Sequence, residues 1–329
     1  MKTIWVTLAF ISLGLVSCGT SVNSETVLSQ KYIHKYGFTV DETEWNQRDG
    51  DGTIESFLAS GVRVTKNFEN GMLHGASTYT YPYSTTLEKT YLYDQGELLK
   101  EIRHDRRGVP MHGFTYEFDS RRVITHWDVN GAPMRIEEYE GELLWHATYF
   151  TPSNEIEAKV ENGDGKRIKR SREGDLLLSD VISNGLLSTR TTYHKNGEVH
   201  MVSHFNDYEL DGTQTIMAEN GTLYMKNHWD QGVLNGTKTS YRDGEKLLET
   251  PYADGIIEGT QKRYDEEGKL LSEIAYKDNM MHGETVHHTG KSKYSEWFYL
   301  GHPINHTRFE ILNSRDDLIA QLDEEEALK

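Results

Sequence analysis

The sequence contains a single cysteine, Cys18, among its 329 residues. An intramolecular disulfide is therefore excluded, and so is a Cys-x-x-Cys metal or redox site. Long hydrophobic runs are also missing, because the longest one, at about 13 residues near the N-terminus, is too short to span a bilayer as a helix. Basic residues are outnumbered, with 35 Lys and Arg against 52 Asp and Glu. This balance disfavours nucleic acid as a partner, since that affinity depends on cations that neutralise phosphates.

The first 17 residues have the features of an export signal. Lys2 precedes the apolar segment 4–16, and Leu15-Val16-Ser17-Cys18 closes it. This ending resembles the lipobox of bacterial lipoproteins, and the resemblance implies cleavage before Cys18 and acylation of that residue. An ordinary cleaved signal with a chance cysteine is the alternative. Because several acyl chains anchor a protein stably, we expect a lipid-anchored protein of the bacterial cell envelope, with Gly19 favouring the outer membrane over the inner one.

Glycine-type turn positions recur with a fixed period along most of the chain. Between residues 182 and 283 one series falls at 185, 208, 232, 255 and 279, a step of 23 or 24 residues, and a second series alternates with it. Weaker positions extend the register, so that about eleven units fill roughly 48–310. The units are least regular at 110–170, where three prolines enter and glycines drop out. A period of this size indicates a repeat protein that grows by adding units.

Each unit has two turn signals separated by short, roughly alternating segments rich in Tyr, Thr, Val and Leu. This pattern predicts a β-hairpin, in which glycine supplies the positive φ that tight turns need. The sequence therefore predicts an all-β fold: an elongated single-layer antiparallel sheet of about eleven 23–24-residue β-hairpin repeats, with aromatic side chains stacking from unit to unit. The glycines assigned to repeat turns are Gly185, Gly212, Gly232, Gly236, Gly255, Gly259 and Gly283.

The segments outside the repeats have separate assignments. The signal covers 1–17, a Ser/Thr-rich flexible tether 18–30, an N-terminal cap 31–47, the hairpin repeats 48–310 and a C-terminal helix 311–329. Ser314 resembles a helix N-cap, and Leu318, Ile319 and Leu322 follow at near-helical spacing. We expect a short acidic helix at 315–328 that caps the open edge of the last strand. Binding a partner is the alternative role for this helix.

The best-defined units resemble a known repeat family. Trp229-Asp-Gln-Gly232-Val-Leu-Asn-Gly236 and Tyr252-Ala-Asp-Gly255-Ile-Ile-Glu-Gly259 are similar to the MORN-repeat variant of bacterial YwqK-like proteins, as is the His-Gly ending of other units. The resemblance extends over about four-fifths of the chain and implies a hairpin-repeat sheet used for binding. Some relatives are named antitoxins of toxin–antitoxin pairs, and eukaryotic MORN proteins act as scaffolds. Repeats of this kind specify a fold better than a function.

The sequence offers no recognisable catalytic or metal-binding motif, so we expect no enzyme activity, no cofactor and no metal. His74, His112 and His282 each precede a glycine at one repeat position, which favours a turn or stacking role over metal ligation. His287 and His288 are adjacent, and adjacent strand residues point to opposite faces of a sheet. Two Asp-Gly-rich segments at 49–52 and 162–165 lack the further acidic ligands of calcium loops and are better explained as tight turns.

One segment departs from the acidic composition. Five of the seven residues at 166–172 are basic, and they form a candidate patch for an anionic partner: Lys166, Arg167, Lys169, Arg170 and Arg172. The alternative is an exposed strand whose cations pair with acidic residues on neighbouring strands. The two interpretations differ in whether the charges remain available to a ligand.

The favoured function is a membrane-anchored, non-catalytic protein-binding or scaffold lipoprotein whose partner is another protein. The alternative, carried by the family resemblance, is an antitoxin or immunity protein, and an enzyme ranks third. Trp127 and Trp145 are candidate contact residues in the irregular units, with packing inside the sheet as the alternative.

Overall fold

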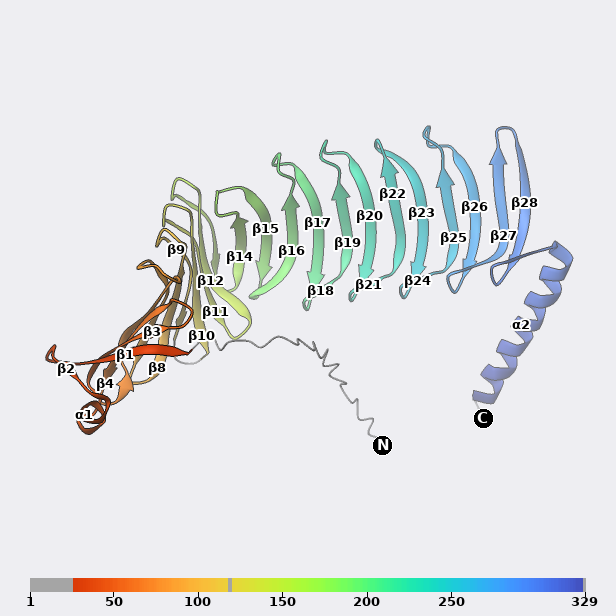
Figure 1. The fold of residues 1–329 in the computed structure, drawn as a ribbon. Helices are drawn as coiled ribbons and strands as arrows, with labels where there is room; N and C mark the ends of the chain where they lie inside the picture. The colour runs from red at the N-terminus through yellow and green to blue at the C-terminus, as the bar shows by residue number, and fades with distance from the viewer. Residues whose placement is uncertain (1–25, 118–119, 328–329) are drawn as a thin grey trace. The chain divides into compact units, whose positions relative to one another are not determined.

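The computed structural model describes residues 26–117 and 120–327 (Figure 1). The signal segment, Cys18 and most of the predicted tether lie outside the described residues. The described chain is all-β with two helices, and its 29 strands pair in antiparallel fashion within one open sheet, as the sequence predicted. By its internal contacts the chain divides into two compact units. The first unit contains the residues up to Leu99 together with Arg106–Gly108, and the second contains Lys100–Asp105 and Val109–Lys329.

The elements begin and end as follows. The first seven strands and first helix are β1 (Val27–His34), β2 (Thr39–Val40), α1 (Glu42–Gln47), β3 (Gly52–Leu58), β4 (Arg63–Glu69), β5 (Met72–Leu73), β6 (Gly75–Thr80) and β7 (Leu87–Asp94). Next come β8 (Glu97–His104), β9 (Pro110–Tyr116), β10 (Arg121–Trp127), β11 (Pro133–Glu140), β12 (Leu143–Phe150), β13 (Ile156–Glu161), β14 (Asp164–Arg170), β15 (Leu176–Ser183) and β16 (Leu186–Tyr193). The most regular repeats supply β17 (Val199–Asn206), β18 (Glu209–Leu210), β19 (Gly212–Met217), β20 (Leu223–Asp230), β21 (Val233–Leu234), β22 (Gly236–Arg242), β23 (Glu245–Ala253), β24 (Ile256–Ile257), β25 (Gly259–Tyr264) and β26 (Leu270–Lys277). The chain ends with β27 (Met280–Thr289), β28 (Ser292–Tyr299), β29 (His302–Ile304) and α2 (His306–Ala327).

Two glycines in each regular repeat have distinct backbone roles. Gly232 (φ 79°) follows Gln231 (φ 46°) in a two-residue hairpin turn, which needs positive φ at both positions. Gly236 (φ 113°) instead follows a bulge that separates β21 from β22, where a Cβ would lie 3.1 Å from the Cβ of His228. The same bulge explains the two-residue strands β18 and β24, which raise the strand count above the predicted two per repeat. All seven predicted turn glycines have positive φ, but only Gly185, Gly232 and Gly255 lie in turns between strands. The other four lie at the start of a strand or inside one: Gly212, Gly236, Gly259 and Gly283.

Backbone hydrogen bonds also join successive two-residue turns. The Gly232 amide donates to the Leu210 carbonyl of the preceding repeat at 2.8 Å, and Gly255 donates to Leu234 at 2.8 Å. Asn279 takes the glycine position in the next turn and donates to Ile257 at 3.0 Å. This edge of the sheet is therefore continuous from repeat to repeat, which explains why the turn spacing varies so little in the sequence.

The sheet of the second unit curls between β8 and β14. These strands are six places apart in pairing order, which would be about 29 Å in a flat sheet. Yet Arg172 Nη2, after β14, lies 3.2 Å from Asp105 Oδ2, after β8. The curl explains how a single layer buries Tyr149 and Val160, each 1 % exposed. We call the face that bears these two residues the inner face of this unit, and the opposite face the outer face.

The inner face between β11 and β16 contains the hydrophobic core. Leu144, Ala147, Tyr149, Val160 and Ile182 form its buried part. Tyr139, Ala158, Ile168 and Leu187 pack around them. The region with the least regular repeats is therefore the one that buries most apolar side chains.

The predicted N-terminal tether and cap are shifted in the structure. The tether was expected to reach residue 30, but β1 begins at Val27 and pairs with β3 along its length, so this boundary was wrong. The predicted cap contains strand residues of the sheet, followed by α1. Asp41 is the N-cap of α1, and its side chain accepts a hydrogen bond from the Glu44 amide at 2.7 Å. Trp45 of α1 is buried and lies 5.6 Å from Tyr32 and 6.1 Å from Phe68, measured between ring centroids.

The C-terminal helix begins earlier than predicted. Asn305 is the residue that caps it, because its side-chain oxygen accepts a hydrogen bond from the Arg308 amide at 2.9 Å. Ser314 therefore lies inside α2, and the expected start at 315 was wrong. Phe309 holds the first turns on the sheet, with its ring 5.0 Å from Trp297 of β28 and 5.3 Å from His282 of β27. The first turns of the helix therefore pack against a face of these two strands, whereas Leu318, Ile319 and Leu322 further along it are exposed.

Candidate functional site

The five basic residues of the candidate patch are divided between the two faces of β14. Arg167 pairs with Asp180 and Lys169 with Leu178, which places both side chains on the inner face, while Lys166 points outward. Arg170 and Arg172 lie at the end of the strand and in the turn that follows. The five side chains therefore do not form one basic strip, and a role in binding an anionic partner stays a prediction for each of them.

Three of these cations are paired with carboxylates, as the alternative interpretation expected. Arg170 contacts Glu157 at 3.0 Å through Nε, and Arg172 contacts Asp105. Arg167 Nε donates to Asp180 Oδ2 at 2.7 Å. Burial opposes the charge of Arg167, but the adjacent Asp180 carboxylate outweighs that effect and raises the pKa of the guanidinium.

Asp180 is the centre of a buried ion-pair network. Its side chain is fully buried, and Arg190 of β16 donates to it from the other side at 2.9 Å, opposite Arg167 of β14. Two guanidinium groups thus share one carboxylate across three neighbouring strands. Asp180 was not among the residues predicted from the sequence. The sequence feature that could have indicated it is an aspartate inside the apolar run Leu176–Ile182, because a buried charge needs a partner.

A second buried carboxylate, Glu137, lies on the same face. Tyr149 donates its hydroxyl to Glu137 at 3.0 Å, and Tyr139 donates at 3.3 Å. Burial, reinforced by the Glu137 charge, raises the pKa of both tyrosine hydroxyls, so both stay protonated donors. The nearest cation, Arg135, has its Nε 3.7 Å from Glu137, too far for a good hydrogen bond.

In the regular repeats, hydrogen-bonded polar side chains also lie along the inner face. Gln214 donates to Ser203 at 2.9 Å and accepts from Asn227 at 2.9 Å, and all three residues are buried. Thr250 and Gln261 form the equivalent bond further along, at 3.1 Å. We call Ser203, Gln214, Asn227, Thr250 and Gln261 the polar row. Because each member is held by its neighbours, these strands have a fixed register.

An aromatic row runs beside the polar row. From β20 onward each ring stands opposite the bulge glycine of the neighbouring strand, as Trp229 does at Gly212 and Tyr252 at Gly236. Every second strand contributes one ring, so neighbouring rings are about 10 Å apart. The rings therefore do not stack directly on one another, which corrects the predicted stacking. The half-buried members of this aromatic row are Phe205, Trp229, Tyr252, Tyr276 and Phe298.

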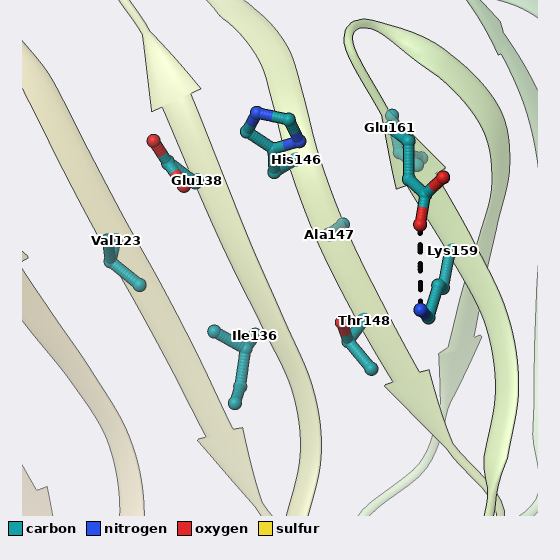
Figure 2. A pocket seen from close by; sticks show the side chains of 9 residues that line it. Val123, Ile136, Glu138, His146, Ala147, Thr148, Lys159 and Glu161 are labelled. Carbon is teal, nitrogen blue, oxygen red and sulfur yellow. Dashed lines mark hydrogen bonds and ion pairs between the residues drawn. The ribbon is translucent and has the colours of Figure 1, made fainter.

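The outer face has a shallow hollow of about 230 Å³ over β10–β13 (Figure 2). His146, Glu138 and Lys159 surround it, and Lys159 Nζ lies 3.5 Å from Glu161. Figure 2 shows these side chains spread around the hollow above separate strands. Its chemistry is that of a mixed polar surface.

The remaining candidate residues have structural contacts. His282 packs on Tyr299 and Phe309, with ring centroids 5.2 and 5.3 Å away, as the stacking interpretation predicted. Trp127 and Trp145 lie over glycines: an added Cβ would approach Trp127 to 3.0 Å at Gly113 and Trp145 to 3.3 Å at Gly163. Both rings therefore pack within the sheet. No cluster of three or more potential metal ligands occurs within 26–117 and 120–327. In the same ranges, neither helix combines the length and the apolar character that crossing a membrane requires.

Comparison with known proteins identifies the repeat unit. The family described as the MORN repeat variant matches residues 257–278. The chain contains a MORN-type repeat. The match runs from β24 through the hairpin of β25 and β26, and so includes a bulge, two strands and a turn. Among curated proteins, none is similar in sequence to this chain. The crystal structure of BamB from Moraxella catarrhalis is similar at 10 % identity over 76 % of this chain and 83 % of that chain, with a TM-score of 0.15, a likeness too slight to bear on the fold.

Proposed function

We propose that this protein is a non-catalytic scaffold that binds another protein along the inner face of β17–β28. The observation that carries the proposal is the aromatic row beside the hydrogen-bonded polar row. The polar row fixes the strands, and the half-buried rings offer contact area at low cost in side-chain entropy. Rings about 10 Å apart match about three residues of an extended polypeptide.

This proposal is tested by photo-crosslinking in cells. A photoreactive phenylalanine analogue at Tyr252 or Tyr276 should yield one discrete protein adduct, and the same analogue at Tyr224, an exposed tyrosine outside the row, should not. Alanine at Tyr252 and Tyr276 together should abolish that complex while the circular dichroism stays that of a folded sheet. Equal crosslinking from all three positions would contradict a dedicated surface.

The proposal includes anchoring of the scaffold to the cell envelope, supported by the lipobox resemblance around Cys18. Cells fed a labelled fatty acid should transfer label to the full chain, and Cys18→Ser should abolish the label and release the protein from membranes. Label that persists in Cys18→Ser would contradict the anchor. The antitoxin alternative rests only on the resemblance to YwqK-like relatives, and a toxin as the crosslinked partner would favour it.

A further inference from the structure

The inner face of β11–β16 contains more cations than carboxylates. Arg167, Arg135 and Arg190 each lie close enough to Lys169 for their charges to lower the pKa of its ammonium group, and the carboxylates of this face are Glu137 and Asp180. This is an unusual local excess for a chain whose formal net charge is −17. It also lies on the curled, partly buried face, where water screens charges less than at an open surface.

The two carboxylates do not neutralise this excess. Asp180 is fully engaged by Arg167 and Arg190. Glu137 accepts hydrogen bonds from two tyrosines and has only a 3.7 Å contact with Arg135. The Arg135 side chain is 15 % exposed, and its buried Nε has no hydrogen-bond partner within the described residues. A buried guanidinium donor without an acceptor is costly, and such a group calls for an explanation.

Unlike Arg135, which lies 3.7 Å from Glu137, Lys169 has no ion-pair partner within the described residues. The side chain is half-buried, and no carboxylate of the described chain comes within ion-pair distance of it. Burial and the charges of Arg167 and Arg135 lower the pKa of its ammonium group. Nearby His126 responds to the same environment: burial and the charge of Arg135 lower its pKa to about 4. The positive electrostatic potential around Lys169 and His126 therefore disfavours an added proton and favours an added negative charge.

We infer that the inner face of β11–β14 binds an oxyanion, a carboxylate or phosphate group of a ligand, at Arg135 and Lys169. The planar guanidinium offers directed N–H donors and the ammonium a mobile charge, which together suit oxygen anions. Arg167 is held in place by Asp180, so its positive charge attracts the oxyanion but its N–H groups that donate to Asp180 are not free to bind it. The inference stands independently of the proposed protein partner.

Lys166 provides a matched control for Lys169. Both lysines belong to β14, but Lys166 is exposed on the outer face. Substitution of either residue by glutamine removes one positive charge from the same strand. A loss specific to Lys169 therefore separates a built site from the general attraction of anions to a basic strand.

The test is calorimetric titration of the purified full chain with two probes, inorganic phosphate and a tetraglutamate peptide blocked at both ends. We expect saturable binding of one probe at one site. Lys169→Gln and Arg135→Gln should each weaken it by about tenfold, and Lys166→Gln by less than about twofold. The probe that binds identifies the source of the oxyanion. Absence of saturable binding by both probes, or an equal loss in Lys166→Gln, would overturn the inference.

Chemical footprinting of the unsubstituted chain gives an independent result if Arg135→Gln does not fold. Lysine acetylation is quantified by mass spectrometry with and without the bound probe. The probe should slow acetylation of Lys169 by about fivefold or more and leave Lys166 unchanged, because a bound anion covers the ammonium and favours its unreactive protonated form. Unchanged acetylation of Lys169 at saturating probe would also overturn the inference.

Discussion

The inner faces of β11–β16 and β17–β28 show two ways to stabilise one sheet. In β11–β16 the repeats are irregular, the sheet curls, and the buried side chains are aliphatic, aromatic or ionised. In β17–β28 the repeats are regular, and many of the buried positions hold small or neutral polar residues such as Ser203, Gln214 and Thr285. A regular repeat gives each strand similar neighbours, whereas a curl gives each strand different ones. Irregular repeat sequences therefore mark the part of the sheet that forms a hydrophobic core.

The first prediction addresses the ionised part of that core and has the largest expected effect. Asp180→Asn leaves Arg167 and Arg190 buried without a counter-charge, so it should destabilise the protein by about 3–5 kcal/mol. The midpoint of urea unfolding, monitored by tyrosine and tryptophan fluorescence, measures this change. Glu219→Gln, which removes an exposed carboxylate, serves as the control and should stay within about 0.5 kcal/mol of the unsubstituted protein. Equal midpoints for Asp180→Asn and the unsubstituted chain would mean that the network does not hold the curl.

The second prediction addresses the neutral polar row of the regular region. Gln214→Ala removes hydrogen bonds to Ser203, Asn227 and Trp229, so it should cost about 1–3 kcal/mol, less than the loss of Asp180. Hydrogen exchange should rise at the amides of β19 and β20 and stay unchanged in β11–β14, because repeats couple mainly to their neighbours. Exchange that rises equally in both regions would show that the two halves of this unit unfold together.

Local features of the fold were predictable from the sequence, and long-range ones were not. Gly232 and Gly255 mark their turns because positive φ is a property of the residue itself and its immediate neighbours. The curl depends on contacts such as Arg172 with Asp105, which are 67 positions apart and have no signature in the spacing. The start of α2 was missed for a similar reason, since Asn305 is one cap candidate among several and the packing of Phe309 on Trp297 decides between them.

The candidate site was predictable only in part. The cluster of cations at 166–172 was visible, but its division between two faces follows from strand alternation once β14 is recognised as a strand. Arg135 belongs to the proposed oxyanion site and comes from a strand more than 30 positions earlier. Its charge acts on Lys169 although three strand pairings separate β11 from β14, and the sequence spacing gives no sign of this.

The third prediction uses pH to distinguish the curled region from the regular one. His126 has a lowered pKa, about 4, caused first by burial and then by Arg135, so the unfolded chain binds this proton more tightly. Its contribution to stability is complete above about pH 6.5 and is lost as the pH falls towards 4. His126→Gln should therefore make the loss of stability over this interval shallower, as measured by urea midpoints at several pH values. His302→Gln, at an exposed position, is the control and should leave the slope unchanged.

The fourth prediction has the smallest effect and concerns a regular turn in which the glycine position is held by tyrosine, a bulkier residue than the Asn279 that replaces glycine in a later turn. Tyr208 occupies the position that Gly232 and Gly255 hold in later repeats, with φ 72°, and its side chain is 64 % exposed. Tyr208→Gly should remove the left-handed strain of about 1–2 kcal/mol, partly offset by the greater freedom of glycine in the unfolded chain, for a net gain of at most about 1 kcal/mol. A higher urea midpoint confirms it. If the midpoint rises and the crosslinked complex at Tyr252 becomes weaker, Tyr208 is retained for contact with the partner at the expense of stability. A lower midpoint would instead show that its ring packs against the turn.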